Sequence, residues 1–340
     1  MIETAIVGGG PAGSYCAYCL AKNDIYPVIF DHTHPREKPC GGLISPLAQK
    51  LFPFLKELPI EHGERNRIYL IPPSGKQICI RLRKSKMLGV SRSKLDQFLV
   101  NMAANKGAKL IKEKVIALKR KKDLWEVKTA RESYLVRTLI GADGVNSLVR
   151  RNITKPLGKT DMGVCYGYLV RGLEKEDVTL RFLSHGKGYI WVIPRKEHTS
   201  LGISCTEISY SHGLERELDM FIAQHYPYVK KISKWAALIP NIKDVKTFRV
   251  PLAGPNWILI GDAAGHVNPI SGEGIVYALL DGELAAQAVF EDNPRLFDKL
   301  WREVYGWSLF TSIKLRKCIS KKTMLGFYCR YLKFQSIIQL

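Results

Sequence analysis

IETAIVGGGPAGSYCAYCLAKNDIYPVIFD, residues 2–31, is the stretch that decides the fold. It opens with an apolar run at Ile2 to Val7 that is typical of a buried strand. Residues 8–13 then match the spacing G-x-G-x-x-G, and Ser14 to Lys22 has the composition of a helix. A second short apolar run follows and ends on Asp31. Strand, glycine turn, helix, strand and acid, in this order, are the dinucleotide-binding fingerprint.

The glycines of this turn predict its geometry. Gly8 permits a tight turn, Gly10 lets the main chain approach a pyrophosphate, and Gly13 lets the helix pack closely on the strand. The anion would rest at the helix N-terminus, where free N–H groups point. Asp31 is predicted to accept hydrogen bonds from a ribose 2′-hydroxyl. The fingerprint does not separate FAD from NAD.

Length and composition bound the class of protein. The 340 residues, 46% of them apolar, suffice for two domains with buried cores. The N-terminus runs straight into a strand and no stretch approaches 18 consecutive apolar residues, so neither a signal peptide nor a spanning helix is predicted. We expect a cytoplasmic protein, or one attached to a membrane from the cytosolic side. The formal charge of +21 favours anionic partners, namely nucleic acid, lipid or phosphorylated ligands, without choosing among them.

The eight cysteines are scattered along the chain. Cys16 and Cys19 form a C-x-x-C, but they lie within the helix after the glycine turn and have no second pair to complete a tetrahedral metal site. We interpret them as small apolar side chains that pack a helix onto a sheet. No metal centre is predicted.

Hydrophobic periodicity predicts the remaining elements. The predicted helices are residues 46–55, 93–106, 214–225 and 274–289, and the predicted strands are residues 67–71, 77–82, 88–91, 115–119, 124–129, 134–137, 163–170, 178–183, 188–194, 200–204 and 257–260. The fold class is therefore α/β. The predicted domains are a discontinuous dinucleotide-binding domain at residues 1–60, 84–158 and 250–290, a substrate-binding antiparallel-sheet domain at residues 61–83 and 159–249, and a basic helical region at residues 291–340.

The C-terminal region combines positive charge with apolar side chains. The residues concerned are Lys314, Arg316, Lys317, Lys321, Lys322, Arg330 and Lys333, interleaved with Phe310, Phe327, Tyr328, Tyr331, Leu332 and Phe334. One interpretation is a surface that rests on anionic lipid headgroups. The other is a helix pair that caps the fold and carries ordinary snorkelling lysines. Both remain open at this point.

Three ligand motifs stand in one order along the chain: residues 8–13, Gly141-Ala142-Asp143-Gly144, and Ile260-Gly261-Asp262-Ala263-Ala264-Gly265-His266. Together they resemble the FAD-binding fold of the glutathione-reductase type, in its aromatic-hydroxylase-like branch. The chain has no second G-x-G-x-x-G, so no resident nicotinamide domain is predicted. The reductant is expected to be external, either NAD(P)H or an electron-transfer protein.

Two further segments narrow the resemblance. Residues 38–46, KPCGGLISP, resemble the K-x-C-G-G signature of the geranylgeranyl reductase family, and residues 188–195, GYIWVIPR, look like its Y-x-W-x-F-P-K signature. Ile193 and Arg195 replace the usual Phe and Lys, and Asp31 replaces the commoner Glu. The Ile193 change makes the second segment partly resemble the W-x-W-x-I-P of flavin halogenases.

The resemblance implies reduction of isoprenoid carbon–carbon double bonds, with hydride from FADH2 and a proton supplied near Cys40. The implied substrate is a geranylgeranyl lipid or a long-chain polyprenyl phosphate. Cys40 is the candidate catalytic residue beside the flavin, on a loop that Gly41 and Gly42 allow to approach the ring; alternatively it is a loop thiol that simply packs. Tyr189 and Trp191, two apart on one strand, project to one face. With Pro194 they are the candidate substrate residues. Alternatively, their side chains only form a hydrophobic face of the sheet.

The resemblance also implies a set of cofactor contacts. Arg92 would meet the phosphate or ribose region, the Gly261-Asp262 strand end the ribityl and pyrophosphate, and Gly272 and Gly274 the flavin pyrimidine edge. His266 is expected to orient its loop. The full candidate set for FAD is Gly8, Gly10, Ala12, Gly13, Asp31, Cys40, Gly41, Gly42, Leu43, Arg92, Val115, Asp143, Gly261, Asp262, Gly272, Gly274 and Ile275.

Two competing functions stay in view. The same scaffold supports an oxygen-using flavoprotein, a monooxygenase or halogenase acting on a hydrophobic substrate. Charge alone suggests a nucleic-acid or membrane-binding protein with a degenerate flavin site, and the intact cofactor motifs argue against that. The expected partners are thus an isoprenoid or polyprenyl lipid, the external reductant and an anionic membrane surface, with no nucleic acid.

Overall fold

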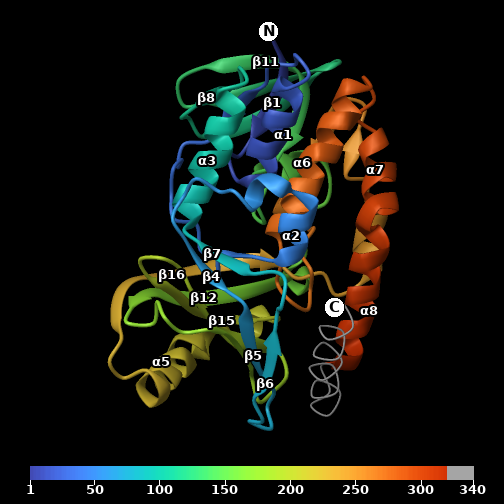
Figure 1. Ribbon diagram of the computed structural model, residues 1–340. Helices are drawn as coiled ribbons and strands as arrows, with labels where there is room; N and C mark the ends of the chain where they lie inside the picture. The colour runs from blue at the N-terminus through green and yellow to red at the C-terminus, as the bar shows by residue number, and fades with distance from the viewer. Residues whose placement is uncertain (320–340) are drawn as a thin grey trace. The chain divides into compact units, whose positions relative to one another are not determined.

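The computed structural model describes residues 1–319 and divides into two compact units (Figure 1). The first unit contains Met1–Arg36, Ser93–Asp161 and Pro240–Ile313. The second contains Glu37–Arg92 and Met162–Ile239, together with the described residues from Lys314 onward. Each unit has its own sheet. Residues 37–60, which the sequence predicts as part of the dinucleotide-binding domain, group with the second unit, and the predicted domain boundaries stay a prediction.

An eight-stranded sheet forms the centre of the first unit. Its strand order is β17-β18-β11-β1-β2-β8, and β10 and β9 continue from β11 as an antiparallel meander built from the strands predicted at 115–119, 124–129 and 134–137. Strands β18, β11, β1, β2 and β8 run parallel. The bounds are β1 Ile2–Val7, β2 Val28–Phe30, β8 Lys109–Ile111, β9 Val115–Lys121, β10 Leu124–Thr129, β11 Ser133–Gly141, β17 Ala253–Gly254 and β18 Trp257–Leu259.

The parallel strands end together. Val7 lies opposite both Gly141 and Phe30, and Gly141 lies opposite Leu259. From β1 the chain crosses to β2 on one side, while β11 pairs on the other side, so β1 marks a reversal of strand order. In open α/β sheets, ligands bind at the carboxyl edge beside such a reversal. All three sequence motifs begin at this edge.

Helices α1 (Pro11–Ala21) and α6 (Ile275–Phe290) lie side by side on this sheet (Figure 1). Their approach depends on Gly282, because a Cβ there would lie 2.8 Å from the Cys16 nitrogen and 2.9 Å from the Ala12 oxygen. Cys16 is a fully buried free thiol, which confirms its role as a small packing residue. Further helices that lie wholly or partly in this unit are α3 Arg92–Ala104, α4 Leu148–Ile153, α7 Leu296–Trp301, the π-helical turn η6 Arg302–Gly306, and α8 Trp307–Ile319, of which the part up to Ile313 belongs to it.

A seven-stranded sheet forms the second unit, in the order β16-β12-β15-β14-β13-β5-β6. All pairs with a described register are antiparallel except β13 with β5. A small sheet, β3-β7-β4, accompanies it. The bounds are β3 Leu43–Ile44, β4 His62–Arg65, β5 Arg67–Ile71, β6 Ile78–Arg81, β7 Met87–Val90, β12 Met162–Arg171, β13 Val178–Phe182, β14 Gly188–Pro194, β15 Thr199–Cys205 and β16 Lys230–Pro240.

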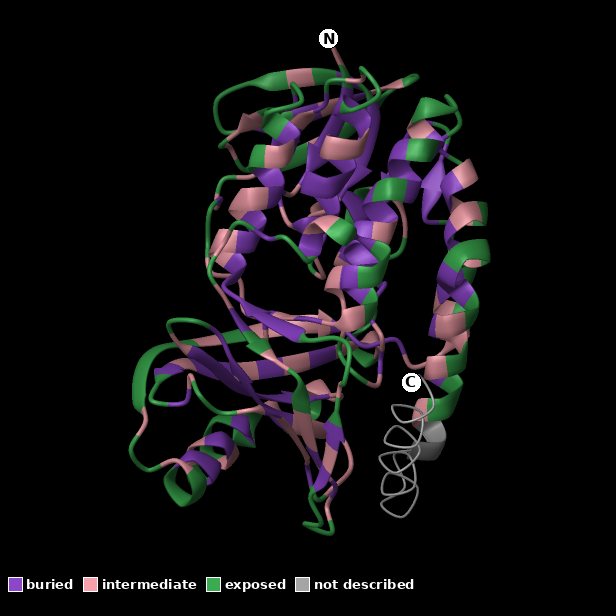
Figure 2. Cartoon of the chain, in the orientation of Figure 1, coloured by how far each residue is buried: buried purple, intermediate pink, exposed green. Residues whose placement is uncertain are grey.

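The two faces of the seven-stranded sheet differ. Helix α5 (Leu214–His225) covers one face, and its Leu214, Leu218, Phe221 and Ile222 join a buried core with the strands. Strand β15 is buried along its whole length (Figure 2). The opposite face carries a second apolar cluster in which several side chains are only partly buried. That second face is part of the candidate site.

Most predicted elements are confirmed, and the differences have local causes. The helix predicted at 214–225 is present, and the strands predicted at 67–71 and 77–82 are present and pair as an antiparallel hairpin. The helix predicted at 46–55 breaks into α2 (Pro46–Leu51) and a 3-10 turn at Pro53–Leu55, because Phe52 precedes a proline and takes an extended φ of −122°. Strand β16 was not predicted, since it is an edge strand whose first residues are exposed and lack clear alternation.

Among residues 1–319, no helix is long and apolar enough to cross a membrane, and no cluster of three or more His, Cys, Asp or Glu residues suits a metal ion. Helix α8 contributes the buried Leu309 and Ile313 to its surroundings. The predicted basic residues Lys321, Lys322, Arg330 and Lys333, with the aromatic residues from Phe327 onward, lie outside the described residues.

Candidate functional site

The glycine turn after β1 is built for a close backbone approach. Gly8 has φ +108°, and a Cβ there would lie 2.3 Å from the Ala142 oxygen. A Cβ on Gly13 would lie 2.0 Å from the Gly8 oxygen. At Gly10 the Cβ position has no atom within 4 Å, so the main chain faces open space there. Gly8 and Gly13 thus close the turn, and Gly10 leaves room for a pyrophosphate, as the fingerprint predicts.

Asp31 follows β2 and is tied to the same turn. Its carboxylate accepts hydrogen bonds from the Gly9 nitrogen at 2.8 Å and from the nitrogen and hydroxyl of Thr33 at 2.9 and 2.8 Å. Partial burial acts to raise the pKa of Asp31, but these bonds and the charge of Arg36 outweigh it, so the pKa lies below its usual range. An ionised acceptor therefore stands beside the turn at neutral pH.

Asp143, from the second motif, organises its own loop. Its carboxylate accepts from the Ser147 hydroxyl at 2.5 Å and from the Val149 nitrogen at 3.1 Å, where Ser147 caps helix α4. Burial raises the pKa of Asp143, although these hydrogen bonds oppose the shift. The residue lies at the carboxyl edge as expected, and the bonds to Ser147 and Val149 show that it supports the loop.

Arg150 connects the second motif to the third and was not singled out from the sequence. Arg150 is 3% exposed, and its guanidinium donates to the Ala263 oxygen at 2.8 Å and to the Lys155 oxygen at 2.9 Å. Burial lowers the pKa of Arg150 to about 10, so it stays charged at neutral pH. Arg150 lies in α4, a short helix that the sequence analysis does not predict, and no local pattern signals its contact with Ala263.

The third motif returns to the start of α1. Gly261 has φ +61°, and a Cβ there would lie 3.0 Å from the Ala12 Cβ. The Cβ position of Gly274, just before α6, lies 3.7 Å from an Asp262 carboxylate oxygen. Ile275 is the first residue of α6, and Gly272, with φ +71°, precedes it in a turn. These predicted cofactor residues are therefore neighbours, whereas Val115 is buried at the start of β9.

His266 lies in a buried polar cluster. Its Nδ1 is 2.8 Å from the Asp281 carboxylate and 2.7 Å from the Tyr305 hydroxyl. Asp281 also accepts hydrogen bonds from the Gly261 nitrogen at 2.7 Å and from the Tyr305 hydroxyl. Burial raises the pKa of Tyr305 well above its usual range, with the Asp281 charge adding to the effect. This cluster holds the Gly261 turn, which supports the interpretation of His266 as a residue that orients its loop.

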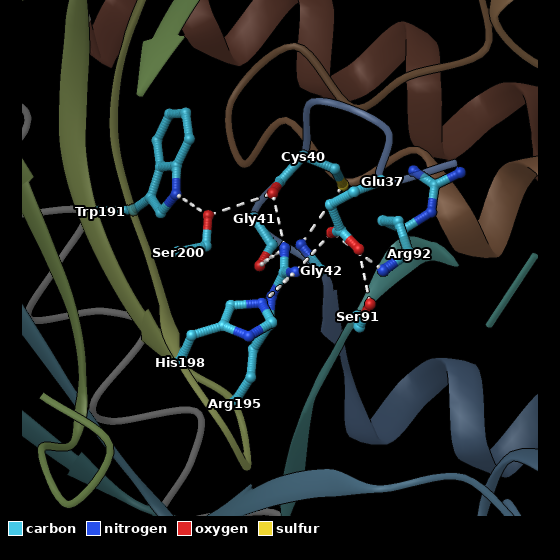
Figure 3. Close-up of polar contacts among 10 residues, drawn as sticks. All are labelled: Glu37, Cys40, Gly41, Gly42, Ser91, Arg92, Trp191, Arg195, His198 and Ser200. Carbon is cyan, nitrogen blue, oxygen red and sulfur yellow. Dashed lines mark hydrogen bonds and ion pairs between the residues drawn. The ribbon is translucent and has the colours of Figure 1, made fainter. Parts of the chain in front are cut away.

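In the second unit, the loop that carries Cys40 packs against β14 and β7 (Figure 3). A Cβ on Gly41 would lie 2.6 Å from the Ile193 Cδ1 atom, and Gly42, with φ +71°, would place one 2.3 Å from the Val90 oxygen. The Gly42 nitrogen donates to the Cys40 Sγ at 3.3 Å. Leu43 then begins β3 opposite Gly89. Gly42 therefore cannot carry a side chain in this arrangement, and at Gly41 a side chain would require the Ile193 methyl group to shift.

The loop meets the second sequence signature directly. Ser200 donates to the Cys40 carbonyl at 3.1 Å and accepts from the Trp191 indole nitrogen at 3.1 Å. Arg195 donates to the carbonyls of Cys40 and Gly41 at 3.0 and 3.3 Å. Figure 3 shows these contacts together. The two signatures, about 150 residues apart in the chain, thus form one site, a pairing that neither signature predicts alone.

The prediction that Tyr189 and Trp191 share a face is confirmed. Their ring centroids are 6.2 Å apart, and Trp191 stacks on Trp235 at 5.8 Å. Burial raises the pKa of the Tyr189 hydroxyl, and the neighbouring thiols of Cys165 and Cys40 add to this effect. The candidate proton donor and the aromatic face therefore belong to one neighbourhood.

Trp235 was missed because β16 was not predicted. It is partly exposed on the apolar face, where the cluster includes Met87, Cys165, Val178, Trp191 and Ile193, with Leu43, Ile68 and Leu180 packed against it. Gly167 and Gly202 lie opposite each other in register beneath the stacked indoles. Their Cβ positions are 2.7 Å from Trp235 and 2.3 Å from Trp191, so only glycine lets the rings lie flat on the strands.

Two predicted residues have contacts of a different kind. Pro194 is buried, and its carbonyl faces Gly63 and Gly89, whose Cβ positions would be 2.9 and 2.0 Å from it. Arg92 is 3% exposed; its backbone nitrogen donates to Glu37 at 3.1 Å, and its side chain extends away from that carboxylate (Figure 3). Pro194 therefore joins β14 to the small sheet, and the Arg92 guanidinium is directed elsewhere than to Glu37.

Comparison with known proteins finds that this chain is similar to several named enzymes. Residues 6–45 match the NAD(P)-binding Rossmann-like domain. A digeranylgeranylglycerophospholipid reductase of Methanocaldococcus jannaschii is 27% identical over 94% of this chain and 87% of its own length. A geranylgeranyl diphosphate reductase of Rhodobacter capsulatus is 29% identical over 84% and 74%. The chain is a homologue of the geranylgeranyl reductases.

Solved structures confirm the fold of this geranylgeranyl reductase homologue. A geranylgeranyl bacteriochlorophyll reductase-like protein of Thermoplasma acidophilum aligns with TM-score 0.81 and 23% identity over 94% of this chain and 87% of its own. A flavin-dependent brominase aligns with TM-score 0.73 and 18% identity over 98% and 93%. The expected α/β fold with a Rossmann-like FAD domain and a helical C-terminal part is confirmed, and FAD is the cofactor that these relatives support.

The carboxylate of Asp31 generates a test of the dinucleotide site. Asp31→Asn leaves one acceptor oxygen for the Gly9 and Thr33 donors and a ribose hydroxyl, so we expect FAD retained after desalting to fall about tenfold. Because the folded pKa is lowered, the wild-type contribution is present above the unfolded pKa and is lost only as pH falls through the lowered value.

Flavin absorbance per protein, followed across an acidic pH series, measures this retention. The matched control is Asp24→Asn, an exposed residue at φ 60° that asparagine tolerates. Equal flavin retention in Asp31→Asn and wild type would contradict the assignment.

Proposed function

We propose that the protein reduces carbon–carbon double bonds of an isoprenoid lipid, using FAD. The observation that carries this proposal is the joining of the Cys40 loop to the aromatic face of Tyr189 and Trp191 within the second unit. Support comes from homologues that cover 84–94% of the chain and are named as reductases of geranylgeranyl compounds. A substrate with a geranylgeranyl chain, or a long-chain polyprenyl phosphate, has the apolar character that this face suits.

An isolated alkene needs a hydride at one carbon and a proton at the other, in a setting from which water is excluded. When bound, FAD in its reduced form supplies the hydride. The proposed proton source is the Cys40 thiol. The thiolate left at Sγ would keep the hydrogen bond from the Gly42 nitrogen, which stabilises negative charge there. Solvent then returns the proton, and an external reductant restores the flavin.

The apolar face has a second part in this proposal. Trp191, Trp235 and the packed aliphatic side chains offer a prenyl chain a surface without competing hydrogen-bond donors, apart from the indole groups. The Trp191 indole nitrogen is already used by Ser200. The ring can therefore contact hydrocarbon without leaving a buried donor unpaired.

The residues present fit FAD at the dinucleotide site. Gly10 offers an approach free of any Cβ contact, Asp31 is held as an ionised acceptor, and Gly261 brings the third motif against Ala12. These features support the proposed contacts of the glycine turn, Asp31 and the Gly261-Asp262 strand end. The roles of Arg92, Gly272, Gly274 and Ile275 toward the cofactor are proposed on the resemblance.

The alternative of a monooxygenase or halogenase gains no support. Flavin-dependent halogenases share the fold at 18% identity or less, whereas the named sequence homologues are reductases. Ile193, the residue that suggested a halogenase-like segment, packs against Gly41 and so supports the loop that carries Cys40. A nucleic-acid-binding protein with a degenerate site is disfavoured by the intact geometry of the glycine turn.

The function is tested anaerobically with reduced flavin. The purified protein, loaded with FAD and reduced with dithionite, is mixed with a geranylgeranyl lipid or a polyprenyl phosphate. Flavin reoxidation with a gain of about two mass units per reduced bond in the product is expected, because each bond takes up a hydride and a proton. If the flavin stays reduced with every lipid but yields an oxygenated or halogenated product in air, the reductase proposal fails.

Cys40→Ala tests the proposed proton donor. The variant should retain FAD, because the backbone contacts of the loop remain, but should lose alkene reduction by about a hundredfold or more. Product mass spectrometry and flavin reoxidation measure the loss. Cys79→Ala, another half-buried free thiol in the second unit, is the matched control and should keep full activity. Full activity in Cys40→Ala would remove Cys40 from the mechanism and return it to a packing role.

We propose that the protein associates with membranes, because its C-terminal region is strongly basic, and truncation of this region tests the proposal. Removal of residues 320–340 takes away four basic and no acidic side chains while sparing the buried Leu309 and Ile313. Binding to vesicles containing anionic lipid should weaken about tenfold or more, and raising salt should weaken wild-type binding in the same direction. Unchanged vesicle binding in a sedimentation assay would favour the alternative role of this region as a cap.

A further inference from the structure

Arg195 is the last residue of the second signature, and its largely buried side chain forms an ion pair with Glu37. The Arg195 side chain is 2% exposed and the Glu37 side chain 27%, and their nearest atoms, Nη1 and Oε1, are 2.5 Å apart. Both residues belong to the second unit. A buried charge pair costs desolvation energy and is weak evidence for stability. The hydrogen bonds of this pair are therefore more informative about which segments the pair holds in place.

The planar guanidinium divides its donors among three segments. Nη1 bonds Glu37 and also contacts the His198 Nε2 at 3.2 Å, which must accept because arginine has only donors. Nη2 donates to the carbonyls of Cys40 and Gly41 at 3.0 and 3.3 Å. The same group thus holds both ends of residues 37–41, as Figure 3 shows.

Glu37 extends the contact to the end of β7. One carboxylate oxygen accepts from the Ser91 hydroxyl at 2.5 Å, and the other accepts from the Arg92 nitrogen at 3.1 Å as well as from Arg195. Glu37 is therefore fixed from two sides. The loop between Glu37 and Gly42 is tied to β7 through Glu37 and to the β14–β15 turn through Arg195.

We propose that Arg195 is a positioning residue that, through Glu37 and the carbonyls of Cys40 and Gly41, sets the orientation of the Cys40 thiol for proton transfer. This inference rests on the proposed function. Fixing the Cys40 and Gly41 carbonyls toward Arg195 fixes the peptide planes on either side of Gly41. The Gly42 nitrogen then faces the Cys40 Sγ. Ser200 holds the same Cys40 carbonyl from β15 as a second anchor.

Position 195 is an arginine in this chain, whereas the signature that the segment resembles usually has a lysine there. A lysine ammonium is a single point of charge on a flexible stem and cannot place two parallel N–H groups on the loop carbonyls while it bonds Glu37. In Arg195→Lys the charge and the pairing with Glu37 survive, but the fork does not. This substitution therefore removes orientation while it keeps electrostatic balance.

The test uses the FAD-loaded full chain with Arg195→Lys and, as matched control, Arg67→Lys, which alters an ion pair with Asp177 in the same unit. Two readouts are taken: steady-state alkene reduction, and the rate of Cys40 alkylation by iodoacetamide, resolved by peptide mass spectrometry. In Arg195→Lys we expect kcat to fall about tenfold with KM changed by less than about threefold. The alkylation rate of Cys40 should change by about fivefold, while that of Cys79 stays constant.

Unaltered kcat and unaltered Cys40 alkylation in Arg195→Lys would overturn the proposal. The alkylation readout needs no substrate, so it tests the clamp even if the wild-type protein reduces no alkene and the proposed function fails. If Arg195→Lys does not fold by circular dichroism, Glu37→Gln, which keeps size and an acceptor oxygen, takes its place with the same expected shifts. Failure of both variants to fold would assign the pair to stability and also overturn a positioning role.

Discussion

The absence of a Cβ at a few backbone crossings is the constraint on which the first unit depends. At Gly8, Gly13 and Gly282 an added carbon would lie 2.0 to 2.9 Å from main-chain atoms that cannot move independently. Gly13 and Gly8 close the turn after β1, and Gly282 lets α6 lie against α1. Because the turn and the helix pair share α1, the carboxyl edge of the sheet can hold a dinucleotide only when these contacts are made.

The second unit uses the same device for another purpose. Gly41 and Gly42 lower a loop onto β14 and β7, and Gly167 and Gly202 let two indoles lie flat on the strands. Helix α5 fills the opposite face with a conventional apolar core. One face of the sheet thus forms the apolar core of this unit, while the other carries a polar loop beside buried and partly buried aromatic side chains. The chemistry proposed here needs both of these on one face.

Sequence reasoning succeeds where a signal is contiguous and stops where partners are distant. The glycine turn, the meander and α5 follow from local spacing, and the two signatures name Cys40 and Trp191 individually. Their junction through Ser200 spans 160 residues, and Arg150 reaches Ala263 across 113, so no local pattern could reveal either contact. Strand β16, and with it Trp235, escaped because an exposed edge strand needs little alternation.

The buried pair of Arg195 and Glu37 is understandable as a device for geometry more than for stability. Apolar side chains of equal volume would avoid the desolvation cost, yet they could not hold two adjacent carbonyls in a defined plane. Those carbonyls belong to the peptides on either side of Gly41, and their orientation decides where the Gly42 nitrogen points. A proton donor next to hydrocarbon has no solvent shell to orient it. In the proposed reductase the backbone must therefore orient the thiol, and Arg195 fixes the conformation of that backbone.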